Sequence, residues 1–292
     1  MDTTNDTPGE QAVDARKRDI DLSREERRAV AERNSANTRV IHEVVRRHGD
    51  EEMERTATSL IWSGVAGGVA ISSSILAEAI IESMLPKGAP WAPLVASLGY
   101  TVGFLVVILG RLQLFTESTL SAVIPVATHP SLRNFGRLVR FWALVLVSNL
   151  VGTLVVAVVI GNNWVASPAQ THAMIELSHK LLDRTWLDTV KMAIPAGFLI
   201  AAVPWTLPAA RGQEFWVVLI LTYVIALGGF AHVVAGSGEA WLLAVTGQTS
   251  FAHAAFGLIL PALIGNVIGG TGLFALLAHA QVRQELGTGH AA

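Results

Sequence analysis

Residues 228–237 read Gly-Gly-Phe-Ala-His-Val-Val-Ala-Gly-Ser and place one histidine, His232, inside a hydrophobic region. The segment from Phe215 to Leu227 before them is apolar, and apolar sequence resumes after Glu239. Ionisable side chains are rare inside membrane-spanning segments, where they mark functional sites. Non-helical backbone persists at membrane depth only where it is buried in protein or lines a wet cavity. We therefore expect a broken membrane-spanning helix, with His232 at the break.

The composition agrees with a protein that crosses a membrane several times. Of the 292 residues, 51% are hydrophobic and 15% are charged, whereas soluble domains carry about 25% charged residues. The first 58 positions hold 25 of the 44 charged residues, so the remainder is almost entirely apolar. The net charge of −2 gives no indication of nucleic-acid binding. The polar, acidic start predicts no cleavable secretory signal, and the absence of cysteine excludes disulfides.

Six segments have the length of about 20 residues that a bilayer crossing requires. They cover residues 60–84, 92–126, 135–160, 187–207, 214–248 and 252–280. The second and fifth are too long for one crossing and contain polar breaks, at residues 110–118 and around His232. The predicted organisation is a polar cytosolic segment (1–58), a six-span channel domain (59–281) and a short cytosolic tail (282–292). Ser23-Arg24-Glu25-Glu26 has the spacing of a helix start.

The distribution of Lys and Arg predicts the orientation. One side of the membrane receives eleven basic residues from the N-terminal segment, together with Arg133, Arg137, Arg140, Arg211 and Arg283. The other side receives only Lys87, Lys180 and Arg184. Because basic residues concentrate on the cytoplasmic side, both termini are predicted to be cytoplasmic, in a cytoplasmic (inner) membrane. His42 lies in the polar N-terminal segment and is expected to be solvated.

The two halves of the chain are related to each other. Each half has a span, a broken span and a span with the pattern Asn-x-x-Gly. The residues of this helix-packing signature are Asn149, Gly152, Gly265, Asn266 and Gly269. Thr116 precedes Asn149 by 33 residues, and His232 precedes Asn266 by 34. Since each half has three spans, the halves must insert in opposite orientations, an arrangement found in transporters and channels with helices broken at mid-membrane.

Taken together, these motifs resemble the formate/nitrite transporter family over about residues 58–280. The matching residues are Leu114-Phe115-Thr116, Gly229-Phe230-x-His232, Asn149-x-x-Gly152 and Pro261-x-x-x-Gly265-Asn266-x-Ile268-Gly269-Gly270. The resemblance implies an all-α membrane protein with an aquaporin-like protomer. Its six transmembrane helices would form a 3+3 inverted repeat, with the second and fifth broken. It also implies a homopentamer in the lipid bilayer, with one pore per protomer for small monovalent anions such as formate, nitrite or hydrosulfide, often with a proton.

The resemblance assigns individual residues to this pore. His232 corresponds to the family's central pore histidine, and Thr116 to the threonine that faces it. The residues assigned to apolar constrictions are Leu114, Phe104 and Tyr100 on one side and Ile225 on the other. Lys180 aligns near a basic vestibule residue of the family, and Arg111 is a second vestibule candidate.

Four residues depart from the pattern that is usual in the family. Gly236 and Gly197 stand where asparagine is expected, and Arg111 and Glu117 lie beside the first break. One interpretation is that Glu117 pairs with Arg111 or with a backbone amide at a helix start. The other is that Glu117 changes the selectivity of the pore or carries protons. Glu78 is expected at the outer interface, with a position in an outer vestibule as the alternative.

Physical chemistry suggests how His232 could act. An anion entering an apolar constriction loses its hydration at a large cost, whereas the neutral acid of the same molecule loses little. An imidazole has a pKa of about 6.5 in water, so it can attract an anion, share a proton and let a weak acid cross nearly neutral. Half-helix N-termini add positive potential, and a hydrogen bond from Thr116 can hold the ring tautomer.

Three functions fit the sequence. The favoured one is passive or proton-coupled transport of small monovalent anions. The second is a channel for neutral polar solutes, although neither break contains the Asn-Pro-Ala sequence of aquaporin-like pores. The third is a non-conducting membrane scaffold or sensor that acts through residues 1–58. No nucleophile-and-base arrangement, metal-ligand cluster or phosphate loop is present, so we expect neither an enzyme nor a cofactor.

Overall fold

The computed structural model describes residues 23–25 and 38–287, and all regular structure in them is helical. A compact unit begins at Thr38, separate from residues 1–37. Of the expected helix start at residues 23–26, Arg24 and Glu25 are helical, and Glu26 lies outside the described residues.

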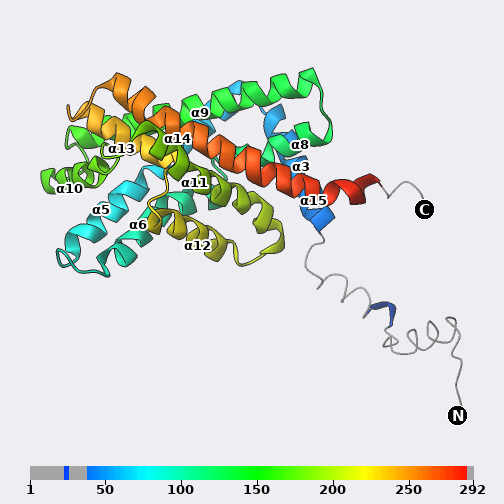
Figure 1. Ribbon diagram of the computed structural model, residues 1–292, viewed down its shortest axis with the longest axis horizontal. Helices are drawn as coiled ribbons and strands as arrows, with labels where there is room; N and C mark the ends of the chain where they lie inside the picture. Colours follow the sequence, from blue (N-terminus) through cyan, green and yellow to red (C-terminus); the bar gives the residue numbers. More distant parts are fainter. Residues whose placement is uncertain (1–22, 26–37, 288–292) are drawn as a thin grey trace, which may run out of the picture. The chain divides into compact units, whose positions relative to one another are not determined.

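Five of the six crossings contain a helix that is long and apolar enough to span a membrane (Figure 1). These helices are α4 and α5 (Ala57–Ile71 and Ser73–Met84), α6 (Ala92–Leu109), α9 (Leu132–Gly161), α11 (Trp186–Thr206) extended by η1 (Leu207–Ala209), and the continuous run of η2 (His253–Ile259), α14 (Leu260–Val267), η3 (Ile268–Ala275) and α15 (Leu276–Gly287). The fifth crossing consists of two short helices, α12 (Glu214–Leu227) and α13 (Val233–Val245). After the first break, α7 (Ser118–Ser121) and α8 (Val123–Thr128) complete the second crossing. The prediction of six crossings with the second and fifth broken is therefore confirmed.

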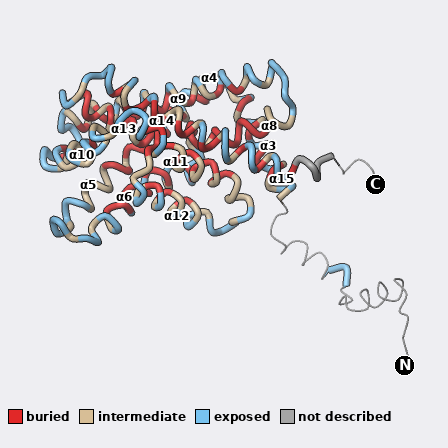
Figure 2. Tube along the Cα trace, in the orientation of Figure 1, coloured by how far each residue is buried: buried red, intermediate tan, exposed pale blue. Residues whose placement is uncertain are grey.

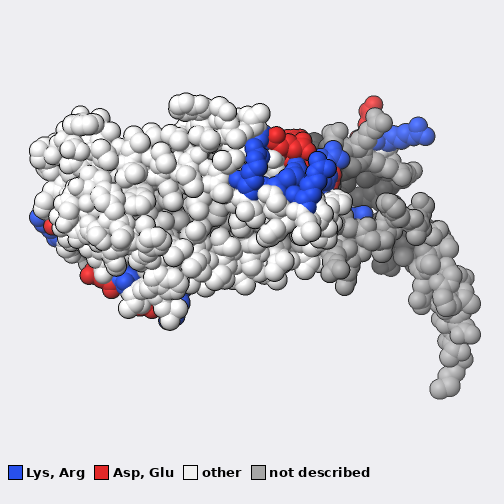
Figure 3. Space-filling view, turned by 90° about the horizontal axis from the view of Figure 1, so that it is seen from above, with Lys and Arg blue, Asp and Glu red and all other residues white. Residues whose placement is uncertain are grey.

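The surface of this unit is suited to lipid. Large apolar side chains are exposed along the long helices, among them Trp62, Leu94, Val147, Ile220 and Phe256. Buried residues lie along the middle of the bundle (Figure 2). On the face seen in Figure 3, charged residues gather at the two ends and leave a broad uncharged band between them. Because water would not tolerate so large an apolar surface, the chain is a multi-pass membrane protein.

Asn149 holds the first break in place. Its Oδ1 accepts a hydrogen bond from the backbone N–H of Phe115 at 2.9 Å. Its Nδ2 donates to the carbonyl oxygens of Gly64, in the first span, and Gln113, in the break, each at 2.8 Å. The asparagine is fully buried, so these bonds replace water for backbone groups that the broken helix leaves unpaired.

Asn266 makes the equivalent bonds at the second break. Its Oδ1 accepts from the backbone N–H of Val233 at 2.8 Å. Its Nδ2 donates to the carbonyl oxygens of Ala193, in the fourth span, and Ala231, in the break, at 2.8 and 2.9 Å. The two sets of bonds match group for group, as an inverted repeat requires.

These bonds fix the register of the repeat. They make Phe115 the counterpart of Val233, because each donates its backbone N–H to the clamping asparagine. The residue equivalent to His232 in the first half is therefore Leu114, and Thr116 is equivalent to Val234. The two halves differ by one residue between the break and the asparagine, and this offset cannot be seen without the hydrogen bonds.

Glycines bring the helices of each half into backbone contact. A Cβ at Gly68 would overlap the carbonyl oxygen of Asn149, and one at Gly197 would overlap that of Asn266. Gly152 and Gly269 are packed in the same way against Val65 and Ile194, respectively, in the facing helices. Gly197 is thus a close-packing residue, the counterpart of Gly68, and its position has no room for the asparagine that the family pattern suggested.

Helix α3 (Thr38–Glu54) packs against α7, α8, α11 and α15. The expectation that His42 is solvated is wrong, because its side chain is buried with Nε2 3.2 Å from Nδ1 of His279. Burial, and next the charge of His279, lower the pKa of His42 below its ordinary value. Glu52 accepts hydrogen bonds from Nε2 of Gln113 at 2.8 Å and from Oγ of Ser121 at 3.0 Å. Through Glu52, α3 fixes the loop that precedes Thr116.

We predict that Asn266→Ala destabilises the protein by about 2 kcal/mol, because three buried backbone groups lose their partner. The thermal unfolding midpoint in detergent measures this change. Asn162→Ala is the matched control, since Asn162 is exposed and its amide donates only to Val158 one turn earlier. Equal midpoints for the two variants would contradict the clamping role of Asn266.

Candidate functional site

The two breaks meet at a contact between Thr116 and His232. Oγ1 of Thr116 lies 2.6 Å from Nε2 of His232, and both side chains are buried. Thr116 comes from the loop between α6 and α7, and His232 is the residue before the first turn of α13. Each break is held by its own asparagine, so this contact is set by two separate clamps. The N-terminal, positive end of α13 also points at this position.

A second hydrogen bond fixes the tautomer of His232. Its Nδ1 accepts the backbone N–H of Ala235 at 3.1 Å and so caps the start of α13. An N–H can donate only to an unprotonated nitrogen, so the neutral ring carries its hydrogen on Nε2. That hydrogen is donated to Oγ1 of Thr116, which leaves the hydroxyl hydrogen of Thr116 available for another acceptor. A proton on Nδ1 would remove the cap, so the charged ring and the cap exclude each other.

Aromatic side chains close the space around this contact. The Phe104 ring packs edge-on against His232 with the ring centroids 4.9 Å apart, and Tyr100 packs on Phe104 at 5.1 Å. Phe104 and Ile225 are fully buried, and Leu114 and Tyr100 nearly so. Of the residues expected at a constriction, Phe104 packs against His232. Tyr100 and Ile225 line the same cavity as His232, and Leu114 is buried in the first break.

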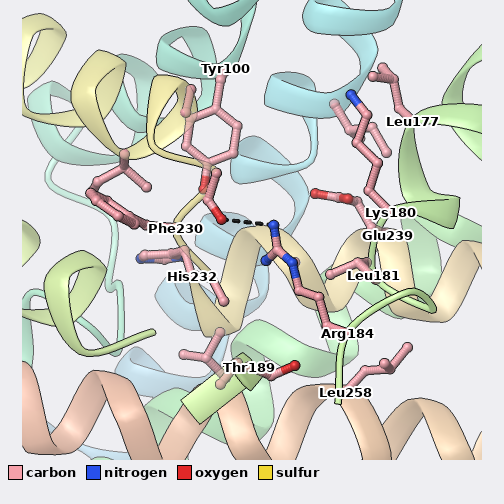
Figure 4. Close-up of a pocket in the computed structure, with 18 of the residues that line it drawn as sticks. Tyr100, Leu177, Lys180, Leu181, Arg184, Thr189, Phe230, His232, Glu239 and Leu258 are labelled. Atoms are coloured by element: carbon pink, nitrogen blue, oxygen red, sulfur yellow. Dashed lines mark hydrogen bonds between the residues drawn. The ribbon is translucent and has the colours of Figure 1, made fainter. Parts of the chain in front are cut away.

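A cavity of about 160 Å³ reaches His232 from the end of the bundle where α10 (Pro168–His179) lies; we call it the α10-side cavity. Tyr100, Ile225 and His232 form part of its lining (Figure 4). Its charged residues are Glu78, Lys180, Arg184 and Glu239. Of these, the sequence assigned only Lys180 to a vestibule and gave Glu78 that position as an alternative. Glu239 follows His232 by seven residues, a helical spacing that could have indicated it.

A larger cavity of about 1000 Å³ opens at the end where α3 lies; we call it the α3-side cavity. Arg111 and Glu117 both line it. Among the residues that the structure describes, Glu117 forms no ion pair with Arg111, and it provides no side-chain cap for α7. The interpretation in which Glu117 pairs with Arg111 or with a backbone amide at a helix start therefore finds no support. Its carboxylate is available to the cavity. Arg111 has a positive φ of 52° in the turn that ends α6.

The space beside Gly236 is open. Gly236 lines the α10-side cavity one turn after His232, and a Cβ added there would meet no atom within 4 Å. Of the two positions where the family pattern has asparagine, Gly236 thus borders the cavity, whereas Gly197 lies at a helix crossing.

This arrangement provides two water-accessible cavities separated by a buried barrier of aromatic and aliphatic groups. Oγ1 of Thr116 and the ring nitrogens of His232 are polar groups within this barrier. Between Ser23 and Glu25 and from Thr38 to Gly287, no group of three or more His, Asp or Glu residues could hold a metal ion. Such a barrier suits a small solute that can be hydrogen-bonded at one point and carries little charge as it crosses.

Comparison with known proteins identifies related sequences and structures. The sequence model of one family, described as formate/nitrite transporter, matches residues 39–280. The "Inner membrane protein YfdC" of Escherichia coli (strain K12) is 38% identical over 246 residues, which cover 84% of this chain and 79% of the relative. The "Formate channel FocA" of Haemophilus influenzae is 22% identical over 234 residues, covering 71% of this chain and 81% of the relative. A solved "Pentameric formate channel with formate bound" superposes with a TM-score of 0.66 at 20% identity, covering 78% of this chain and 98% of that one.

Gly197 and Gly236, the two glycines that depart from the family pattern, are predicted to respond differently to replacement by asparagine. We expect Gly197→Asn to lower the thermal unfolding midpoint strongly, because the new side chain collides with the backbone of Asn266. We expect Gly236→Asn to change stability by no more than about 0.5 kcal/mol, since the space there is open. Thermal unfolding and gel filtration in detergent test both. A tolerated Gly197→Asn would mean that this helix crossing is looser than described.

Proposed function

The chain belongs to the formate/nitrite transporter family, and we propose that it carries small monovalent anions of weak acids across the membrane. The expected solutes are anions of the formate and nitrite type. Each protomer of a homopentamer has its own pore. The proposal is supported by relatives described as formate channels and by the fold shared with a pentameric one. The observation that carries it is the buried contact between Thr116 and His232. His232 lines the α10-side cavity, and Glu117, next to Thr116 in the chain, lines the α3-side cavity.

We further propose that the α3-side cavity faces the cytoplasm and the α10-side cavity faces outward. The support is the charge distribution, since the end with α3 carries Arg133, Arg137, Arg140 and Arg211. The membrane is the cytoplasmic (inner) one, which agrees with the description of the Escherichia coli relative as an inner membrane protein.

The proposed crossing couples anion binding to the protonation of His232. In the closed state the ring is neutral, with Nδ1 engaged as the helix cap. An anion that reaches the Thr116 hydroxyl favours the charged ring, because opposite charges stabilise each other in a dry environment. The ring then releases its cap, at a cost of about 1 kcal/mol, and takes a proton on Nδ1. It can pass the Nε2 proton to the anion, and the neutral acid then crosses the barrier at Phe104.

We predict that His232→Asn lowers acid-stimulated formate uptake severalfold but keeps the protein stable. The asparagine oxygen can accept the backbone N–H of Ala235 as a helix cap, yet it cannot exchange a proton. His232→Ala loses both roles and should also be about 1 kcal/mol less stable. Uptake of formate, nitrite and chloride into proteoliposomes between about pH 5 and about pH 8, with unfolding midpoints, checks this. Acid-stimulated uptake at the wild-type rate in both variants would overturn the role of His232.

Glu117 is proposed to exchange protons between the α3-side cavity and the site at Thr116. It is next to Thr116 in the chain, lines this cavity and has no ion pair with Arg111.

We expect Glu117→Gln to leave pentamer assembly intact and to slow the acid-stimulated part of formate uptake severalfold. Gel filtration and the proteoliposome assay measure the two effects. Glu54→Gln is the control, since Glu54 is an exposed carboxylate at the same end that does not line the cavity. Wild-type uptake in Glu117→Gln would remove Glu117 from the proton path.

A further inference from the structure

The α10-side cavity contains as many carboxylates as cations. Its charged lining residues are two glutamates, Glu78 and Glu239, and two basic residues, Lys180 and Arg184. They come from four different segments: α5, α13, the end of α10 and the turn before α11. A vestibule that concentrates anions needs an excess of positive charge. This one has none.

Glu239 and His232 line the same cavity, His232 at the start of α13 and Glu239 within this helix. Glu239 is two helical turns further along α13, and two turns place residues on the same helix face. Like Glu78, it is only partly exposed. Among the described residues, Glu78, Glu239 and Lys180 take part in none of the ion pairs. No close ion pair therefore fixes either carboxylate to a basic side chain, and both glutamates line the cavity.

Arg184, by contrast, is tied to the fold. Its Nη2 donates to the carbonyl oxygen of Gly229 at 2.9 Å, drawn as the dashed line in Figure 4. Gly229 has a positive φ of 58° and lies in the turn that follows α12. A cation at the C-terminal end of a helix is partly offset by the negative end of the helix dipole. The effective positive charge offered to an anion is thus closer to that of Lys180 alone.

The same balance occurs at the other end. The α3-side cavity is lined by four arginines, Arg47, Arg55, Arg111 and Arg211, and by four glutamates, Glu51, Glu52, Glu117 and Glu214. Neither approach to Phe104 and His232 therefore carries an excess of basic residues, although the proposed solute is an anion.

We propose that Glu78 and Glu239 make the α10-side cavity an entrance for the uncharged form of the solute, the protonated weak acid, and exclude the free anion. This inference rests on the proposed transport function and specifies which protonation state enters from that side. The carboxylates cancel the attraction that Lys180 and Arg184 exert on anions. They also accept hydrogen bonds from an acid O–H, which an anion cannot donate. The neutral acid thus arrives at His232 without an electrostatic penalty.

The test neutralises the two carboxylates and compares a weak acid with an ion that has no neutral form. In wild-type proteoliposomes, formate uptake should follow the concentration of formic acid, and chloride uptake should be slow at every pH. Glu78→Gln with Glu239→Gln should raise chloride uptake about tenfold at low ionic strength. Salt should remove most of this gain, because it screens exposed charges within about 10 Å.

Two controls separate the charge of the cavity from charge in general. Glu82→Gln removes the same charge from the same helix, at an exposed position that does not line the cavity; chloride uptake should stay at the wild-type level. When Lys180→Gln is added to the two glutamate changes, the gain in chloride uptake should fall from about tenfold to about threefold. If the double glutamate variant does not assemble, Glu239→Gln alone should show an intermediate gain of about threefold.

Anion binding measured without transport decides the inference independently. At about pH 8 and constant ionic strength, formate should not raise the thermal unfolding midpoint of the wild type but should raise that of the double variant. A wild-type midpoint that rises with formate, or a double variant with wild-type chloride uptake and no rise, would overturn the proposal. A wild type that takes up neither formate nor chloride, while its midpoints behave as predicted, would refute only the transport function.

Discussion

The whole architecture depends on hydrogen bonds that replace water inside the membrane. Breaking a helix at mid-membrane frees backbone groups, and lipid offers them no partner. Asn149 and Asn266 meet this requirement with three bonds each, to a break and to the first helix of the same half. Glycines beside them allow the necessary approach of the helices. Because both breaks are fixed in this way, Thr116 and His232 can meet at hydrogen-bonding distance.

This constraint gives His232 two roles at once. As the cap of α13 it belongs to the fold, and as the neighbour of Thr116 and Phe104 it lies at a polar point of the barrier. The cap keeps the neutral ring in one tautomer. In the proposed mechanism, the free energy that releases the cap comes from the arriving anion, so an unoccupied site holds a neutral ring. Charge-balanced cavities on both sides fit the same principle, because each avoids accumulating ions that the barrier cannot pass.

Much of the fold follows from the sequence, since span length, polar breaks and the Asn-x-x-Gly pattern are local features. The relation of Thr116 to His232 came from the family resemblance. What could not be predicted depends on contacts between distant segments. The one-residue offset of the repeat, the burial of His42 against His279 and the packing of Gly197 are of this kind. The charge balance was missed for the same reason, because Glu78 and Glu239 are far from Lys180 and Arg184 in the chain.

The central claim is that a proton accompanies each anion through the barrier at His232. Simultaneous recording of formate uptake and lumenal pH in proteoliposomes, with and without an imposed membrane potential, tests it most directly. The account predicts one proton taken up per formate and a rate that does not depend on the potential. Formate uptake that follows the potential and leaves the lumenal pH unchanged would contradict it.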